Sequence, residues 1–221
     1  WYFKKKINNK KINIINIKFK FNKAFDKITD RSNNYIKKSF DAALDLLKNK
    51  KAIGMINGPI SKKHFLEKKY PGVTEYVFQK SKEKKSINPI MLIYNKNLSV
   101  SPITTHVPLK NVSKMIKKSL IVNNTLHINQ FYKNKLKKKP KIAILGLNPH
   151  CESKTKINEE KREIMPAIHK LRKKGINIKG PFSADTFFLK NNIIKYDSVI
   201  GMYHDQVLTP FKTLFGFDAS N

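Results

Sequence analysis

The chain has 221 residues, of which 40% are hydrophobic, so it can bury the core of one large globular domain or two smaller ones. Its 46 basic residues outnumber its 15 acidic residues and give a formal net charge of +31. Nearly all of this charge is lysine, whereas arginine is favoured for bidentate contacts to bases and phosphates. We therefore interpret the charge mainly as solvated surface and keep a basic nucleic-acid-binding module without catalysis as an alternative.

The cysteine count and the hydropathy indicate the cellular compartment in which we expect the protein. Its single cysteine, Cys151, excludes an internal disulfide framework and fits a reducing compartment, and we interpret it as a bystander thiol rather than a nucleophile. No apolar run approaches the roughly 18 residues that a membrane span needs. We predict a cytoplasmic protein without a membrane partner. Because the chain begins at Trp1 and stops at Asn221 after a turn signal, we also expect a fragment that lacks both ends.

Segments with the apolar periodicity of strands alternate along the chain with segments that have the periodicity of helices, and turn residues separate them. In the first half they predict a strand over 12–21 with a bulge, a helix over 32–47 capped by Ser32 or Asn33, a strand over 52–56 ended by Asn57-Gly58-Pro59, a helix beginning at 74, and a hairpin of 89–94 with 98–104. In the second half they predict a helix over 109–132, a strand over 142–147, a helix over 158–173, a connection at 180–181, a helix over 184–192 and a strand over 198–203. Such alternation predicts an α/β fold with a largely parallel sheet.

Three histidines follow predicted strands, at the positions where ligands collect in open α/β sheets. They are His106, His150 and His204. Three neutral imidazoles with one open position are a common catalytic metal set. Their separation along the chain is long, however, and a histidine that follows a strand is often only a hydrogen-bonded structural residue. The pattern therefore leaves a metal site and three structural histidines open.

Two charged residues near the last histidine are candidates for chemistry. Asp205 can orient an imidazole, act as an acid or base, or cap the next helix. Lys212 follows His204 by two helical turns or one short loop, but it is one lysine among many. No glycine-rich dinucleotide loop or P-loop motif is present, so neither of those standard nucleotide sites is predicted.

Six motifs in order along the chain resemble those of the 4-hydroxythreonine-4-phosphate dehydrogenase family of pyridoxal phosphate biosynthesis. They are Asn57-Gly58-Pro59-Ile60-Ser61-Lys62, Gly72-Val73-Thr74-Glu75, Thr104-Thr105-His106-Val107-Pro108-Leu109, Gly146-Leu147-Asn148-Pro149-His150, Gly180-Pro181-Phe182-Ser183-Ala184-Asp185-Thr186 and Met202-Tyr203-His204-Asp205-Gln206. The resemblance runs from about residue 32 to the end of the chain.

This resemblance implies an isocitrate/isopropylmalate-dehydrogenase-like α/β/α sandwich of two subdomains. We expect residues 1–71 to form part of the first and residues 72–221 to form the second, with the metal site. The family forms a homodimer with its active site at the subunit interface. It oxidises and decarboxylates its phosphorylated hydroxy-amino acid with NAD or NADP and a divalent metal such as zinc, magnesium or cobalt.

The same resemblance assigns roles to individual residues. It implies that His106, His150 and His204 ligate the metal. It places Thr74, Lys212 and Asn221 against the substrate, with Lys212 and Asp205 as the catalytic residues.

Two departures from the family pattern bear on these roles. Val73 replaces a substrate-contacting histidine, so a dehydrogenase of another four-carbon phosphorylated hydroxy acid is an alternative. The family's opening strand and its C-terminal part, with a substrate-binding arginine, have no counterpart in the sequence. A fragment with a dead site, which binds metal without turnover, is therefore a third interpretation.

Overall fold

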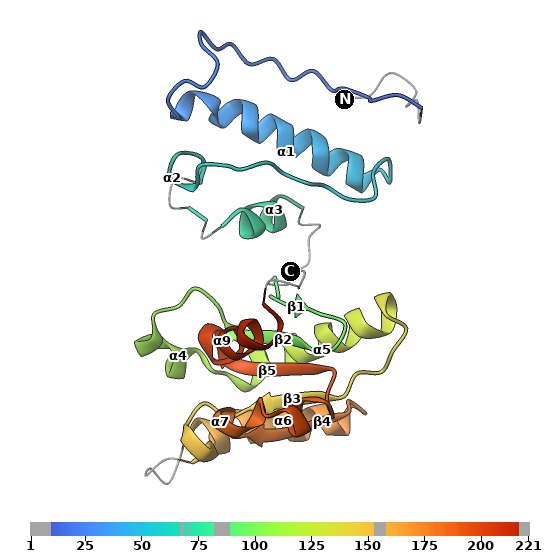
Figure 1. Cartoon of the computed structure of the whole chain (residues 1–221), viewed down its shortest axis with the longest axis vertical. Coiled ribbons are helices and arrows are strands. Elements are labelled where there is room, and N and C mark those ends of the chain that lie inside the picture. Colours follow the sequence, from blue (N-terminus) through green and yellow to red (C-terminus); the bar gives the residue numbers. More distant parts are fainter. Residues whose placement is uncertain (1–9, 67–68, 71, 82–88, 153–157, 217–221) are drawn as a thin grey trace. The chain divides into compact units, whose positions relative to one another are not determined.

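The structure is a computed structural model that describes residues 10–66, 69–70, 72–81, 89–152 and 158–216. The chain divides into two compact units, Trp1–Pro89 and Ile90–Asn221 (Figure 1). None of the helices in the described ranges combines the length and apolar character that crossing a membrane requires.

The first unit is helical where it is regular. A 3-10 turn, η1 (Asp30–Ser32), leads into α1 (Asn33–Lys48), and α2 (Lys62–Phe65) and α3 (Val73–Ser81) follow. The first long helix confirms the prediction from apolar spacing, and Ser32 occupies its N-cap position without a side-chain capping bond. Three buried residues, one from α1, one after α2 and one from α3, form the small core of this unit: Phe40, Leu66 and Tyr76.

The two strands predicted in this unit do not form. Residues 12–21 and 52–56 are irregular, and large side chains such as Ile12 and Ile53 are exposed. A strand needs a neighbour for its backbone hydrogen bonds, and in the described part of this unit neither segment has one. Both predictions were therefore wrong for the chain as it stands.

The second unit is built on a five-stranded sheet in the order β1-β2-β5-β3-β4. The strands are β1 (Ile93–Tyr94), β2 (Ser99–Thr104), β3 (Ile142–Leu145), β4 (Ile178–Phe182) and β5 (Ser198–Tyr203). Only the pairing of β1 with β2 is antiparallel, which confirms the predicted hairpin. β2, β5, β3 and β4 are parallel, so their carboxyl ends lie at the same edge of the sheet.

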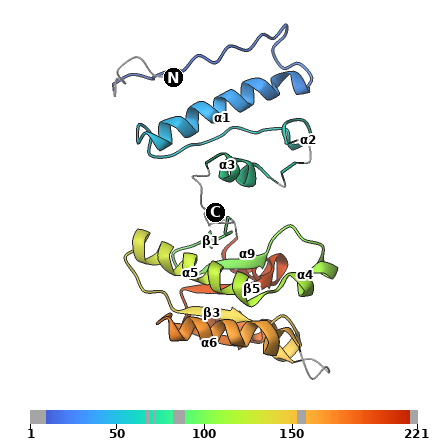
Figure 2. The ribbon, with the colours of Figure 1, turned by 180° about the vertical axis from the view of Figure 1, so that it is seen from behind.

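Helices cover both faces of this sheet. On one face lie α4 (Leu109–Met115), α5 (Lys118–Lys135), the π-helical turn η3 (Glu160–Ile164) and α6 (Met165–Lys173); on the other lie α7 (Ala184–Phe187), α8 (Lys190–Ile193) and α9 (His204–Phe215). Figure 2 shows α5 and α6 toward the viewer, and Figure 1 shows α9. Along β3, Ile142 and Ile144 enter the first core and Ala143 and Leu145 the second, because successive side chains point to opposite faces. The predicted α/β/α layering is present in this unit.

Several predicted boundaries in this unit need correction. The single helix over 109–132 is interrupted at Ile116 and Lys117, whose extended backbone separates α4 from α5. The connection predicted at Gly180-Pro181 lies inside β4, where the peptide is cis. The helix predicted over 184–192 is two short helices, α7 and α8.

The division between the units falls after the boundary that we predicted at residue 72. The reason is that α3, which follows that boundary, packs its Tyr76 against Phe40 and Phe65 of the first unit, with ring centroids 5.3 and 5.0 Å apart. Aromatic contacts of this kind bury large apolar areas. Thr74 therefore belongs to the first unit, whereas the predicted metal ligands belong to the second.

Candidate active site at the carboxyl edge of the sheet

Two of the three predicted metal ligands lie close together. His106 follows the end of β2, and His204 begins α9 directly after β5. Because β2 and β5 are neighbours, the two imidazole rings have centroids 6.0 Å apart and planes inclined by 36°. Beneath them Thr104, buried at the end of β2, donates a hydrogen bond of 2.8 Å to the carbonyl of Met202 and joins the two strand ends.

His204 is oriented by its neighbour in sequence. Its Nδ1 lies 2.7 Å from Asp205 Oδ1. With Nδ1 as the protonated nitrogen, the ring donates to this carboxylate and leaves the lone pair of Nε2 available. A hydrogen bond to a carboxylate also makes the imidazole more basic and hence a better ligand. This is the orienting role considered for Asp205 from the sequence.

His150 lies apart from this pair as the structure stands. It is the middle residue of the 3-10 turn η2 (Pro149–Cys151), with φ 55° and ψ 17°, and its side chain is 76% exposed. Its nearest charged partner is Asp185, at the start of α7, with Nδ1 and Oδ2 3.7 Å apart. A hydrogen bond from Ser183, opposed by desolvation, holds the pKa of Asp185 below its usual range, so this carboxylate stays ionised.

Three imidazoles are suitable ligands for a divalent ion, but the structure does not bring all three together. Among the residues that the structure describes, no three His, Cys, Asp or Glu side chains come close enough together to hold a metal ion. The three imidazoles follow adjacent parallel strands at one edge, in the order β2, β5 and β3. The structure therefore brings His106 and His204 together and leaves His150 on a separate, exposed turn.

Gln206 is a site residue to which the sequence assigned no role. It is 9% exposed, its Oε1 accepts the backbone N–H of Met202 at 2.6 Å, and its Nε2 donates to the carbonyl of Gly146 at 2.7 Å. This amide thus joins the end of β5 to the end of β3. Its membership of the Met202–Gln206 motif was the available signal, but the motif does not show that the side chain is buried.

Cys151 is a partly buried free thiol in the same turn as His150. Burial, with smaller contributions from nearby carboxylates, raises its pKa above the usual value. A raised pKa disfavours the thiolate, the form that acts as a nucleophile.

The predicted substrate-contacting residues are spread over the chain. Thr74 is exposed near the start of α3. Lys212 is exposed on α9, two turns after His204. Asn221 lies outside the described residues. Val73, which replaces the family histidine, begins α3 and packs against the Phe40 core of the first unit.

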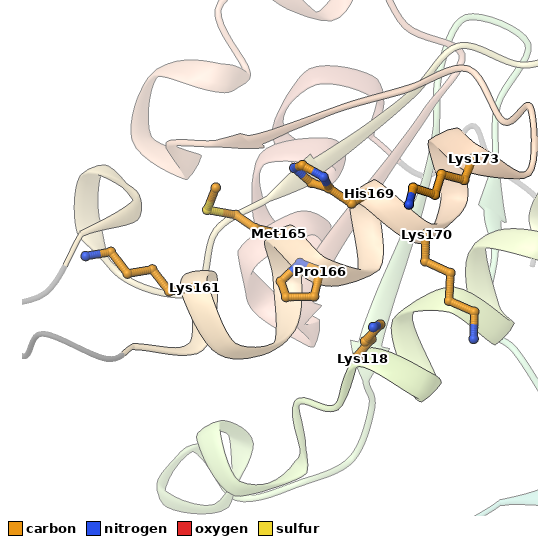
Figure 3. Close-up of a pocket in the computed structure, with 7 residues that line it drawn as sticks. All are labelled: Lys118, Lys161, Met165, Pro166, His169, Lys170 and Lys173. Atoms are coloured by element: carbon orange, nitrogen blue, oxygen red, sulfur yellow. The ribbon is translucent and has the colours of Figure 1, made fainter.

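A separate cavity of about 670 Å³ lies on the helices that cover the α5/α6 face of the sheet. Figure 3 shows its lining, which is Lys118, Lys161, Met165, Pro166, His169, Lys170 and Lys173. None of these is a predicted ligand or substrate contact. The cluster fits the solvated basic surface inferred from composition.

The parallel sheet and its strand-end histidines define an α/β protein of the class that binds ligands at the carboxyl edge. The model of the family described as pyridoxal phosphate biosynthetic protein PdxA matches residues 3–221. The chain belongs to this family, as the six motifs predicted.

Named relatives and solved structures agree with that assignment. A 4-hydroxythreonine-4-phosphate dehydrogenase from Sulfurihydrogenibium is 43% identical over 79% of this chain and 53% of its own length, and one from Aquifex aeolicus is 38% identical over 73% and 50%. The crystal structure of the enzyme of the same name from Klebsiella pneumoniae superposes with a TM-score of 0.74 at 28% identity, over 86% of this chain and 58% of that one. The predicted isocitrate-dehydrogenase-like α/β fold is thereby confirmed. The chain spans about half the length of the relatives that it matches.

Proposed function

We propose that this chain is part of a dehydrogenase that oxidises 4-phosphohydroxy-L-threonine with NAD or NADP and releases carbon dioxide. The product is 3-amino-2-oxopropyl phosphate, an intermediate of pyridoxal 5'-phosphate biosynthesis. The observation that carries the proposal is the pair His106 and His204, which lies at the carboxyl edge of the sheet within the family's motifs. The names of the relatives support the reaction, and family membership supports the pathway.

His106, His150 and His204 are the proposed holders of a divalent ion, either zinc, magnesium or cobalt. When bound, such an ion supplies positive charge that lowers the pKa of the substrate hydroxyl and stabilises the negative charge that develops on its oxygen. The chain contributes the orientation of the ligands. Asp205 holds His204 through Nδ1, so Nε2 faces away from the carboxylate.

The remaining predicted site residues act on the substrate. Lys212 is proposed to pair with an anionic group of the substrate or to relay a proton, and its position on the same helix as His204 supports this role. Thr74 and Asn221 are proposed substrate contacts on the strength of the family motifs.

Val73 bears on the identity of the substrate. An apolar side chain cannot supply the hydrogen bond that an imidazole gives, and a missing polar contact discriminates strongly between substrates. A dehydrogenase of another four-carbon phosphorylated hydroxy acid therefore remains the alternative of the same class.

We also propose a homodimer with a shared active site, in the cytoplasm. The resemblance supports the dimer, and the single cysteine supports a reducing compartment. Sedimentation of the chain at several concentrations tests the dimer, because a monomer at every concentration contradicts it.

The test of the reaction is the absorbance of NADH or NADPH formed from 4-phosphohydroxy-L-threonine, with and without a chelator and added Zn²⁺, Mg²⁺ or Co²⁺. It is made on this chain and on the protein extended to the length of its relatives. Chelator-sensitive reduction by the extended protein supports the proposal and shows that Val73 is tolerated. No reduction with metal still bound favours the other phosphorylated hydroxy acid, and metal binding without turnover in the short chain alone marks it as an inactive fragment.

The alternative of another class is a basic nucleic-acid-binding module without catalysis, for which the lysine-lined cavity of Figure 3 is the candidate contact surface. That function predicts tight binding to DNA or RNA that falls steeply with salt and is indifferent to metal. A divalent ion that raises the melting temperature supports the metal site instead, since a ligand of the folded state must stabilise it.

A further inference from the structure

The turn that carries His150 has a conformation that is costly for its residues. His150 and Cys151 both have positive φ angles, of 55° and 60°. This left-handed region costs a non-glycine residue about 1–2 kcal/mol. Such a backbone persists only where surrounding contacts over-determine it. The imidazole itself is 76% exposed, so the contacts that fix the turn must come from elsewhere.

Most of those contacts converge on one buried carboxylate, and Glu159 Oε2 accepts one further hydrogen bond of 3.0 Å from the Asn148 amide. Glu160, the first residue of η3, is 2% exposed. Its Oε1 accepts the backbone N–H groups of Leu147 and Asn148, each at 2.8 Å. Its Oε2 accepts a further hydrogen bond of 2.8 Å from the Asn148 side-chain amide. Three donors from two adjacent residues thus hold this one side chain.

The link from this carboxylate to His150 passes through the backbone. The carbonyl of Asn148 accepts the N–H of Cys151 at 3.0 Å and closes the turn in which His150 is the middle residue. Because Glu160 fixes Asn148 through both its backbone and its side chain, it fixes one end of that turn.

The packing at Gly146 shows how closely the loop approaches this carboxylate. A Cβ at Gly146 would lie 3.2 Å from Glu160 Oε1 and 2.7 Å from Cys151 Sγ. Burying a carboxylate is costly unless hydrogen bonds satisfy it, and bonds to an ionised acceptor are among the stronger ones. Glu160 is therefore bound to this loop more firmly than a surface carboxylate could be.

We propose that Glu160 is a positioning residue that anchors the base of the loop 146–150, and so keeps His150 at the end of β3, next to the strand β5 that leads to His204. This inference rests on the proposed role of His150 as a metal ligand. Glu160 does not itself touch the ion. Its removal is expected to loosen the loop and weaken metal binding while the sheet stays intact.

The matched pair of variants is Glu160→Gln and Glu163→Gln. Both lie in η3, both lose one negative charge, and Glu163 likewise accepts a backbone N–H, that of Lys118 at 2.7 Å. Of these two residues, only Glu160 has hydrogen bonds to the loop 146–150. In Glu160→Gln the new amide places a donor where Asn148 also donates, so that bond is lost and the bond from Asn148 to Glu159 remains. The acceptor of the Leu147 and Asn148 N–H groups also loses its charge, which weakens both bonds.

The first readout is amide hydrogen exchange at Leu147 and Asn148, followed by NMR in the metal-free chain. We expect Glu160→Gln to speed exchange at these two amides about tenfold, the effect of losing about 1.4 kcal/mol of local stability, and Glu163→Gln to leave them unchanged. Equal exchange in both variants overturns the anchoring role.

The second readout is the titration of each variant with Co²⁺, followed by its visible absorption, with the melting temperature measured in parallel. We expect Glu160→Gln to raise the apparent dissociation constant at least about tenfold and to change the spectrum, because loss of supporting contacts typically weakens metal sites by about 10- to 100-fold. An effect no larger than that of Glu163→Gln overturns the proposal. If the unchanged chain binds no Co²⁺, the proposed metal site fails, and amide exchange alone then decides whether Glu160 anchors the loop.

Discussion

Similar strand-like sequence patterns form a sheet in the second unit and irregular segments in the first. In the second unit, apolar runs such as 142–145 and 198–203 become neighbouring strands of one sheet. In the first unit, residues 12–21 and 52–56 show comparable patterns and stay irregular, with Ile12 and Ile53 exposed. A strand pattern states a preference for extended backbone, and only a hydrogen-bonded neighbour converts the preference into a sheet.

The largest expected effect contrasts one isoleucine from each unit. Ile144 is fully buried in the middle of β3, whereas Ile53 is fully exposed. We expect Ile144→Ala to lower the free energy of unfolding by about 2–5 kcal/mol, because it leaves a cavity in the core. Ile53→Ala should change it by less than about 0.5 kcal/mol. Urea unfolding measures both, and comparable losses would contradict the contrast between the units.

A metal-dependent effect of similar size is expected at the carboxyl edge. In a concentration of Co²⁺ about 100 times its dissociation constant, the chain should gain about 2.7 kcal/mol of stability. His204→Ala should lose this gain. His127→Ala should keep it, because His127 is a half-buried residue of α5 whose Nδ1 contacts the carbonyl of Asn123. Thermal unfolding with and without Co²⁺ measures the gain, and equal gains in both variants would refute the assignment of His204.

A steric prediction compares a glycine from each unit. A Cβ at Gly201, in β5, would lie 2.4 Å from Val207 Cγ1 and 2.9 Å from Gln206 Oε1, whereas one at Gly58 has open space around it. We expect Gly201→Ala to cost about 1–3 kcal/mol, as overpacking does. Gly58→Ala should cost less. The midpoints of urea unfolding compare the two, and a harmless Gly201→Ala would show that α9 is not packed closely on β5.

The last expected effect appears in alkaline solution only. Burial raises the pKa of Tyr132, in the core of the second unit, to about 12 from the usual 10. Its phenol therefore ionises in the unfolded chain before it does in the folded chain, so the folded state binds more protons between pH 10 and 12. Stability should fall across that interval by up to about 1.4 kcal/mol per pH unit.

The variant Tyr132→Phe isolates this contribution. It also loses hydrogen bonds to Ser99 and to the carbonyl of Asp197, so it starts from a lower stability. Its stability should nevertheless fall less steeply with pH. Parallel curves for the two proteins between pH 10 and 12 would show that Tyr132 does not titrate in this way.

The sequence predicted the elements with strong periodicity and the histidine positions, and it missed what depends on distant partners. It placed the strand over 198–203 and the hairpin correctly because each has a local signal. It could not show that residues 12–21 have no strand neighbour in the described part of the chain. Nor could it show that extended backbone at Ile116 and Lys117 divides one helical pattern into α4 and α5. Periodicity reports the faces of an element and not the contacts that terminate it.

The candidate site likewise contains residues whose positions could be predicted from the sequence and residues whose positions could not. The strand-end positions of His106 and His204 were readable, and their proximity follows from the pairing of β2 with β5. The position of His150 depends on the φ angles of a turn, and that of Glu160 on burial beneath it. In sequence, Glu160 is one of two adjacent acids in a lysine-rich stretch, and nothing in that pattern marks it as buried.

The amide of Gln206 has a consequence for how the chain finds its strand register. One end of this amide can only accept and the other only donate, and they meet an N–H of β5 and a carbonyl just after β3. A slip of one residue between these strands turns the side chains of one strand to the opposite face and changes the groups that meet Gln206. The Gln206 amide therefore favours the register of β5 and β3 in which both its oxygen and its nitrogen have hydrogen-bond partners. Other registers leave one of these atoms without its present partner.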